Sequence, residues 1–357
     1  LAIAYNVWQY VNTTGDVDFM KKFGAEIIFE IARFWASKSE LNTKTNKYSI
    51  HKVMGPDEFH ESYPNAEEGG ISDNAYTNIM VSWLFAKVPE ILEMIWDDAE
   101  ELLSKISLKE DEINLWNEIQ QNLNIIVNED GIISQYDAYF DLKELDWDHY
   151  FKKYTNVYRM DRLLKAEGKT ADDYKVAKQA DTLMTFYNLN KETVDKIMSD
   201  MSIDLPKDYL EKNLEYYLKR TSHGSTLSRV VHAQLAKLIG DDKLSWDLYS
   251  GALSSDYNDI QGGTTAEGIH AGVMAGTIMI GLSTYAGIDI RGEVLNINPK
   301  LPDNWKAIKF NMGFKGVDYI FNVNHKEVSI TPNKESIIKC KGEALCLAAN
   351  KETSITL

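Results

Sequence analysis

Hydrophobic residues recur at helical spacing through the first four-fifths of the chain. Between Asp18 and Ser37 they stand three or four positions apart, as on one face of an α-helix, and Asp16 provides a start signal. The same spacing predicts further helices at 74–96, 102–123, 173–187, 191–201, 207–218, 230–238, 244–253 and 266–285. Many of these segments are broadly apolar, which indicates helices buried on more than one side in a layered assembly.

After Gly287 the spacing changes to period two. Apolar and polar residues alternate in short runs separated by turn residues, at 294–298, 308–312, 319–323 and 328–330. This pattern predicts a small antiparallel β domain. We therefore expect a mainly α protein with two domains, a helical one over residues 1–287 and a β-sheet one over residues 288–357.

Four connections between the predicted helices are long or rich in polar residues and glycine. They cover residues 42–72, 128–156, 220–225 and 255–265. Because long connections within a compact domain usually carry function, we expect the chemistry of the protein to lie there.

Composition narrows the class of protein. The 357 residues carry a formal net charge of −16, which argues against a nucleic-acid partner because an acidic surface repels phosphate backbones. Two cysteines are too few for a disulfide framework or a zinc site, and no apolar run is long enough to span a membrane. The first residues resemble a helix already under way and not a signal peptide, so we expect a cytoplasmic protein that begins well upstream.

The densest group of reactive side chains lies in the first long connection. A Gly-Pro turn at 55–56 is followed by the carboxylates of Asp57, Glu58 and Glu61, beside a histidine. A carboxyl group among apolar and like-charged neighbours tends to have a raised pKa, which suits it to donate a proton at neutral pH. The alternative is a solvated acidic loop with an incidental histidine.

The segment 220–228 leads directly into a predicted helix. It brings an arginine, an imidazole and two hydroxyl groups to free backbone N–H groups at the helix start, from Arg220, His223, Ser225 and Thr226. Such a helix start binds anions, which would be a local exception in an acidic chain. An ordinary Ser or Thr cap explains one hydroxyl group but not the whole cluster.

A Gly-rich segment, 261–270, opens the last predicted helix. Gly262 and Gly263 allow a ligand to approach the backbone closely, and the segment ends in His270, which in isolation would be taken for a core residue. The segment lacks the Gly-Lys-Ser/Thr sequence of a P-loop and does not follow a strand as a dinucleotide fingerprint does. No zinc-type spacing of His residues recurs, so no metal site is expected.

Five stretches, taken in chain order, are similar to family sixty-five of the glycoside hydrolases and phosphorylases, which includes maltose, trehalose, kojibiose and nigerose phosphorylases. They are residues 54–61, 73–78, 178–181, 222–228 and 268–270. The family fold consists of an amino-terminal β-sandwich, a linker, an (α/α)6 barrel and a carboxyl-terminal β-sheet domain. The resemblance therefore implies the later helices of the barrel, incomplete at its amino-terminal side, followed by the final β domain.

The resemblance also implies roles for individual residues. Glu58 matches the general acid that protonates the glycosidic oxygen. Lys178 and Gln179 match positions that hydrogen-bond the glucosyl unit, although a Lys on the predicted helix 173–187 would otherwise be a surface side chain. Phosphate-binding positions of the family are matched by His223, Ser225, Thr226, Gly263 and His270.

The activity that this implies is inverting phosphorolysis of an α-linked glucosyl disaccharide to β-glucose 1-phosphate and a free sugar. Phosphate is already an anionic nucleophile, so such a site needs hydrogen-bond donors and no carboxylate base, and no cofactor is expected. Some hydrolytic relatives have Glu near the position of His223, where a unit negative charge would repel phosphate by about 4 kcal/mol at about 4 Å and an effective dielectric of about 20.

Two alternatives remain at this point. One is an α-glucoside hydrolase of the same family, and the other is a non-catalytic sugar-binding or assembly fragment. Besides disaccharide and phosphate, the expected partners are the missing amino-terminal half of the same protein and a second copy in a homodimer.

Overall fold

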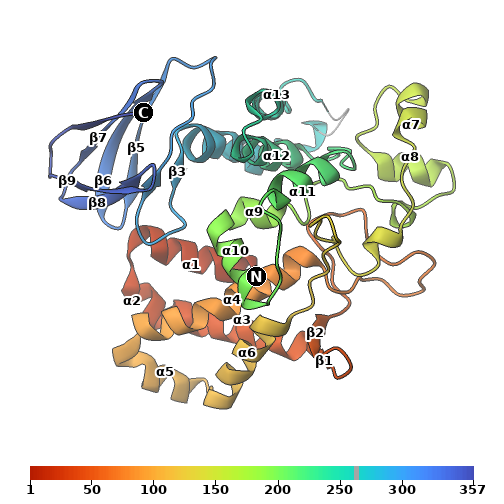
Figure 1. Ribbon diagram of the computed structural model, residues 1–357, viewed down its shortest axis with the longest axis horizontal. Helices are drawn as coiled ribbons and strands as arrows, with labels where there is room; N and C mark the ends of the chain where they lie inside the picture. The colour runs from red at the N-terminus through yellow and green to blue at the C-terminus, as the bar shows by residue number, and fades with distance from the viewer. Residues whose placement is uncertain (261–264) are drawn as a thin grey trace.

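The structure, a computed structural model, describes residues 1–260 and 265–357. Helices dominate its first part, and the strands of the carboxyl-terminal part gather at one end of the molecule, in blue at the upper left of Figure 1. The helices are α1 (Ala2–Thr14), α2 (Val17–Phe19), α3 (Ala25–Lys38), α4 (Ala75–Met94), α5 (Ala99–Lys105), α6 (Glu110–Asn122), α7 (Trp147–Lys153), α8 (Met160–Ala166), α9 (Met184–Asn188), α10 (Lys191–Asp200), α11 (Tyr209–Leu218), α12 (Thr226–Leu238), α13 (Asp242–Leu253) and α14 (Ala271–Met279).

Helix α4 lies at the centre of the larger hydrophobic core. Buried side chains stand at consecutive positions, Ile79, Met80 and Val81, so this helix is covered on several sides. Helices α3 and α6 pack against it, and Trp116 of α6 stacks on Phe85. The broadly apolar sequence correctly indicated a helix surrounded by others.

The first helices also leave apolar side chains exposed. Ile3, Phe23 and Phe34 are each more than half exposed, whereas the buried side of α3 is formed by Ile28, Phe29 and smaller residues. After α3 the chain forms a short hairpin of β1 (Ser39–Asn42) and β2 (Lys47–Ile50).

The predicted helix 173–187 is wrong. Only a 3-10 turn at Ala171–Asp173 and the five-residue α9 are helical there. Between them the chain forms a parallel bridge from Ala177 to Thr221, and the backbone groups used in such a bridge are not available to a helix. The predicted helix 102–123 is also divided, into α5 and α6, by a turn in which Ser107 has a left-handed backbone with φ 53°.

Two four-stranded sheets make up the carboxyl-terminal part. Their orders are β10-β7-β6-β5, which is antiparallel throughout, and β3-β4-β8-β9, in which β4 and β8 are parallel. The strands are β3 (Ile288–Asp289), β4 (Asn296–Ile297), β5 (Ala307–Phe314), β6 (Val317–Asn324), β7 (Glu327–Pro332), β8 (Ser336–Cys340), β9 (Glu343–Leu347) and β10 (Thr353–Thr356). The period-two pattern thus correctly predicted strands, and the mainly α fold class with a small β domain is confirmed.

A second hydrophobic core joins the last helices to these sheets. Val230 and Ala233 of α12 belong to the same buried cluster as Phe321 and Val323 of β6. Trp305, just before β5, packs edge-on against Tyr285 at a ring-centroid distance of 5.4 Å. The β domain therefore supports α12 and α14, whose amino-terminal ends carry the predicted phosphate site.

A small lobe around α7 and α8 has a hydrophobic cluster of its own, and Figure 1 shows it on the side of the molecule opposite the carboxyl-terminal sheets. Tyr150, Met160 and Leu164 are buried in this cluster together with Phe59. Because Phe59 directly follows Glu58, the lobe anchors the loop that carries the predicted acid. Among the described residues, no helix has both the length and the apolar character required to cross a membrane.

Candidate active site

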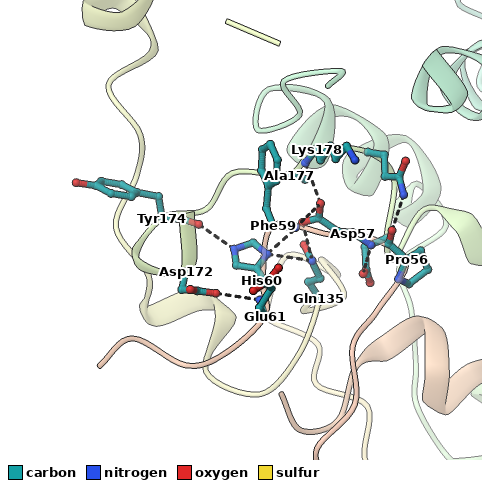
Figure 2. A network of polar contacts seen from close by, with 12 residues as sticks. Pro56, Asp57, Phe59, His60, Glu61, Gln135, Asp172, Tyr174, Ala177 and Lys178 are labelled. Carbon is teal, nitrogen blue, oxygen red and sulfur yellow. Dashed lines mark hydrogen bonds and ion pairs between the residues drawn. The ribbon is translucent and has the colours of Figure 1, made fainter. Parts of the chain in front are cut away.

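The loop around Glu58 is built on a buried aspartate. Asp57 is 1% exposed, and its carboxylate accepts hydrogen bonds from Lys178 N (2.8 Å), His60 Nδ1 (3.1 Å) and Gln135 Nε2 (3.3 Å). Figure 2 shows these donors converging on Asp57, His60 from the loop itself and Lys178 and Gln135 from two other segments of the chain. The loop is therefore held in part by residues far away in sequence.

A second buried carboxylate, Asp181, receives the backbone of the same loop. Its Oδ2 atom accepts from Asp57 N at 3.0 Å, and its Oδ1 atom accepts from Asn74 Nδ2 at 2.7 Å. Burial raises the pKa of the Asp181 carboxyl group to about 7, although these hydrogen bonds oppose the shift. Gly55 is required here, since a Cβ atom at this position would lie 2.0 Å from Asp181 Oδ2.

His60 completes this network. Its Nε2 atom donates to the carbonyl oxygen of Tyr174 at 3.0 Å, because a carbonyl can only accept, and its Nδ1 atom faces Asp57. Burial alone would lower the pKa of His60, but the hydrogen bond to Asp57 and the charge of that carboxylate raise it overall. His60 thus links the loop to Tyr174 through both of its ring nitrogens, a structural role that the sequence pattern did not indicate.

Glu58, the predicted general acid, points to the outside of this network. Its side chain is 60% exposed and forms an ion pair with Lys178, with 2.6 Å between Oε2 and Nζ. Lys178 was predicted on a helix but lies on the extended segment after Tyr174, with a side chain only 16% exposed. Gln179 Nε2 donates to the carbonyl oxygen of Pro56 at 2.6 Å. The structure thus brings all three predicted sugar-site residues together.

The predicted phosphate segment adjoins Lys178. Ala177 N donates to the carbonyl oxygen of Arg220, and Ser222 N donates to that of Ala177, both at 2.8 Å. Gly224 then passes so close to its neighbours that a Cβ atom would lie 2.4 Å from the carbonyl oxygen of Tyr158 and 3.1 Å from Lys178 Cγ. The sugar-site lysine and the start of α12 are therefore side by side.

The start of α12 has the character of an anion site. Ser225 occupies the N-cap position, but its side chain makes no capping hydrogen bond, so the alternative of an ordinary cap at Ser225 is wrong. The Oγ1 atom of Thr226 is buried and has no hydrogen-bond partner among the described residues. A helix start with spare donors favours a bound anion.

His223 lies just before this helix start, in a left-handed backbone conformation with φ 52°. Its Nδ1 atom is 3.0 Å from Ser228 Oγ, and its ring packs edge-on against His232 at a centroid distance of 5.1 Å. Burial, together with the neighbouring His232 and Arg229, holds the pKa of His223 well below its usual range. His223 is therefore a neutral hydrogen-bonding group at neutral pH.

Positive charge near this helix start comes from Arg229 and not from Arg220. The guanidinium group of Arg220 forms an ion pair with Glu144, with 2.8 Å between Nη2 and Oε1, and lies 3.7 Å from the ring centre of Tyr216. The guanidinium of Arg229 lies 5.2 Å from the ring centre of Tyr158. Arg220 consequently does not supply the charge that its position in the sequence suggested.

The second predicted phosphate segment is described only in part. Gly263 lies outside the described residues. His270 forms the N-cap of α14, and its Nδ1 atom is 2.6 Å from Asp256 Oδ1, while its backbone N donates to Asp256 Oδ2 at 2.8 Å. The sequence analysis missed Asp256, which is not part of any of the recognised motifs.

The arrangement supplies an exposed carboxyl group, a neighbouring ammonium group and an uncapped helix start. These groups can donate a proton, bind a polar ligand and hold an anion, respectively. Among the described residues, no cluster of three or more His, Cys, Asp or Glu side chains could hold a metal ion.

Comparison with known proteins places the chain in a family. The glycosyl hydrolase family 65 central catalytic domain matches residues 1–279, and the C-terminal domain of the same family matches residues 288–346. Trehalose 6-phosphate phosphorylase of Lactococcus lactis is 41% identical over 357 residues, which is 100% of this chain and 45% of that protein. Kojibiose phosphorylase of Caldanaerobacter subterraneus is 33% identical and aligns with 97% of this chain and 43% of its own length.

A solved structure from the human microbiome, assigned as a kojibiose phosphorylase, superposes with a TM-score of 0.80 at 25% identity, over 99% of this chain and 49% of that one. The chain thus spans less than half the length of the relatives that it matches. The likeness confirms the helical barrel followed by a β domain. With both of its matched regions in family order, the chain belongs to glycosyl hydrolase family 65.

Proposed function

We propose that the protein containing this chain catalyses inverting phosphorolysis of an α-linked glucosyl disaccharide to β-glucose 1-phosphate and a free sugar. Glu58 is the general acid, and Lys178 and Gln179 bind the glucosyl unit. Phosphate is bound by His223, Ser225 and Thr226 together with the segment of Gly263 and His270. The observation that carries the proposal is that Lys178 pairs with the Glu58 carboxylate and lies close to Gly224, just before the uncapped start of α12.

The proposed order of events starts from the ion pair of Glu58 and Lys178. Glu58 is a carboxylate while it is paired with the ammonium group, 2.6 Å away. A glucosyl hydroxyl group that binds the ammonium group would release the Glu58 side chain from this pair, so that it can face the glycosidic oxygen as the general acid. Phosphate then attacks the anomeric carbon from the opposite face, which inverts its configuration.

The choice of phosphate over water rests on the donors near α12. A hydrolase of this type needs a second carboxylate to activate water. Asp256, a few residues before the second phosphate segment, has both of its oxygen atoms engaged with His270. Neutral His223 and the hydroxyl group of Thr226 can both donate to phosphate oxygens, so this surface suits an anion better than a base-activated water.

The proposal leaves the identity of the disaccharide to a panel of substrates. Relatives of the chain carry the names of trehalose 6-phosphate, kojibiose and maltose phosphorylases, and these three disaccharides head the substrate panel. We expect a cytoplasmic enzyme that needs no cofactor besides phosphate as co-substrate. We also expect the site to need the remainder of a longer protein, and the protein to act as a homodimer.

The test is a product assay on the complete gene product that contains residues 1–357. Each disaccharide is incubated with and without phosphate, and the products are followed by NMR, which separates β- from α-glucose 1-phosphate. β-Glucose 1-phosphate formed only with phosphate supports the proposal. Release of glucose without phosphate would favour the hydrolase, and sugar binding without turnover would favour a non-catalytic role.

Glu58→Gln tests the assignment of the acid. The amide keeps the size of the side chain but cannot donate a proton of the required acidity, so turnover of the disaccharide should fall by roughly 10²–10⁴-fold. Because Glu58 is largely exposed, the thermal stability should stay near that of the parent. A variant with near-normal turnover would remove Glu58 from the mechanism.

A further inference from the structure

Two hydrogen bonds cross between the loop of Glu58 and the segment of Lys178, and they run in opposite directions. The Asp57 carboxylate accepts from the backbone N of Lys178 at 2.8 Å. In return, the backbone N of Asp57 donates to the Asp181 carboxylate at 3.0 Å. We call this pair of reciprocal bonds the Asp57–Asp181 clamp. Neither segment can slide along the other without breaking one of its bonds.

The clamp is anchored to the rest of the fold on both sides. Asp57 also accepts from His60 and Gln135, as Figure 2 shows, and Asp181 also accepts from Asn74. The Oδ1 atom of Asn74 in turn accepts from the backbone N of Thr77 at 2.9 Å, which caps the first turn of α4. Helix α4, at the centre of the larger hydrophobic core, therefore helps to fix the clamp.

The two carboxyl groups of the clamp are buried, which is unfavourable in free energy. Asp57 and Asp181 are only 1% and 4% exposed, and burying carboxyl groups costs free energy unless donors surround them. An apolar pair could join two loop segments without that cost. Two carboxylates at these positions fix the geometry of one loop segment relative to the other, because each carboxylate accepts a hydrogen bond from a specific backbone N–H group.

We propose that Asp57 and Asp181 are positioning residues that fix the carboxyl group of Glu58 relative to the glucosyl unit held by Lys178. The inference rests on the proposed function. Asp57 is bonded to both ends of the Glu58–Lys178 pair, through the peptide bond to Glu58 and through the hydrogen bond to Lys178 N. A shift of about 1 Å between a catalytic group and its target can cost about 100-fold in rate.

Two substrates that carry the same glucosyl group distinguish a loss of acid positioning from a general loss of structure. One is the natural disaccharide, whose leaving oxygen requires a proton. The other is α-glucosyl fluoride, with phosphate as the acceptor: the bond from the anomeric carbon to fluorine breaks, a bond to a phosphate oxygen forms, and fluoride leaves with the electron pair. Because fluoride departs with little need of a proton, this reaction depends weakly on where Glu58 stands.

Asp181→Asn is the first variant, and it is assayed at about pH 8, where the Asp181 carboxyl group, with its pKa of about 7, is largely ionised. Asp57 N and Asn74 Nδ2 each donate a hydrogen bond to one oxygen atom of Asp181. In Asp181→Asn an NH2 group replaces one of these oxygen atoms, so one of the two donors must face another donor. Asn74 cannot turn its amide round, because its Oδ1 atom is bonded to Thr77. We expect kcat for the disaccharide to fall at least about tenfold and kcat for α-glucosyl fluoride to change less than about threefold.

Asp73→Asn is the matched control. Asp73 is 6% exposed and also accepts four hydrogen bonds, but from Ser49, Ile50, Asn78 and Asn124 and not from the loop of Glu58. It should lower the melting temperature and leave the ratio of the two activities unchanged. The inference is overturned if Asp181→Asn lowers both activities equally, or if Asp73→Asn shifts the ratio as much as Asp181→Asn does.

Gly55→Ala provides a second variant should Asp181→Asn fail to fold. A Cβ atom on Gly55 would lie 2.0 Å from Asp181 Oδ2, so the loop must move away from Asp181 without any change of charge. The same shift in the ratio of activities is expected, and an equal loss on both substrates would again overturn the inference. A parent enzyme that cleaves the disaccharide without phosphate would instead refute the proposed function and leave the test of positioning intact.

Discussion

At the scale of single residues, two neighbouring carboxylates have opposite surroundings. Asp57 has a fully buried side chain that accepts only hydrogen bonds from the protein, whereas Glu58 is 60% exposed and meets a single ammonium group. The Gly-Pro turn before them presents both side chains, and burial alone separates the structural one from the one that can react.

His223→Glu should convert a phosphate ligand into a repulsive group. The carboxylate would stand at the start of α12, where neutral His223 now lies beside Ser228. We expect the KM for phosphate to rise about tenfold or more, since like charges a few ångströms apart repel strongly in a partly buried site. The KM for the disaccharide should change little. His223→Gln, which keeps a neutral donor, is the control, and equal phosphate dependence in both variants would exclude His223 as a ligand.

Asp181 should make the stability depend on pH. Its pKa is about 7 in the folded chain and starts from an ordinary value of 3.8, so the folded chain holds this proton over a range in which the unfolded chain has released it. The stability that Asp181 contributes is therefore greatest at low pH and falls as the pH rises from about 4 to about 7.

The measurement is the melting temperature of the parent minus that of Asp181→Asn, taken at several pH values. We expect this difference to fall as the pH rises from about 5 to about 7. His60 and Asp57 face Asp181, and the raised pKa of His60 also removes stability as the pH rises, but it does so in both proteins. A difference that is constant with pH would show that Asp181 does not titrate in this range.

At the scale of elements, the site depends on how closely the segment before α12 approaches its neighbours. Gly224→Ala would place a methyl group 2.4 Å from the carbonyl oxygen of Tyr158 and 3.1 Å from Lys178 Cγ. The helix start must then move away from Lys178. We expect kcat/KM for the disaccharide and phosphate to fall at least about tenfold.

Gly292→Ala is the control for this prediction. A Cβ atom there would find only the carbonyl oxygen of Val294 at 3.8 Å, which is an ordinary contact. It should leave the kinetics unchanged. Full activity of Gly224→Ala would mean that the segment before α12 and Lys178 do not need their close contact.

The sequence predicted most helices and strands because their patterns reflect burial on one or more faces. The prediction of a helix over residues 173–187 failed, because most of this segment is not helical and its residue Ala177 forms a bridge with Thr221. The sequence analysis found Glu58 and the start of α12 as motifs, and the family resemblance added Lys178. Asp181 and Asp256 could not be assigned roles, because their partners are brought to them by the tertiary structure and not by neighbouring sequence.

At the scale of the whole molecule, several apolar side chains on the first helices are exposed to solvent. Ile3, Phe23 and Phe34 are 64%, 57% and 51% exposed, and such residues on the surface of one folded unit suggest contact with another. The relatives of the chain are about twice as long as the part that aligns with it. We therefore expect these helices to pack against further parts of the same protein.

Residues 1–357 expressed alone should accordingly be inactive or nearly so. The measurement compares their turnover with that of the complete gene product, and their oligomeric state is followed by light scattering. Replacing Phe23 and Phe34 by Ser should reduce association of the isolated chain, as seen by light scattering, but lower the stability of the complete protein. A monodisperse, fully active chain of 357 residues would refute this expectation.

The clamp beneath Glu58 also bears on how the protein acquires its activity after synthesis. Its two bonds join residues 121 and 124 positions apart, with the lobe of α7 and α8 lying between them in sequence. Contacts at such separation form only after a large loop has closed, which costs chain entropy that local helix formation does not. Helical signal should therefore return on refolding before turnover does, and recovered turnover would report that these two remote segments have met.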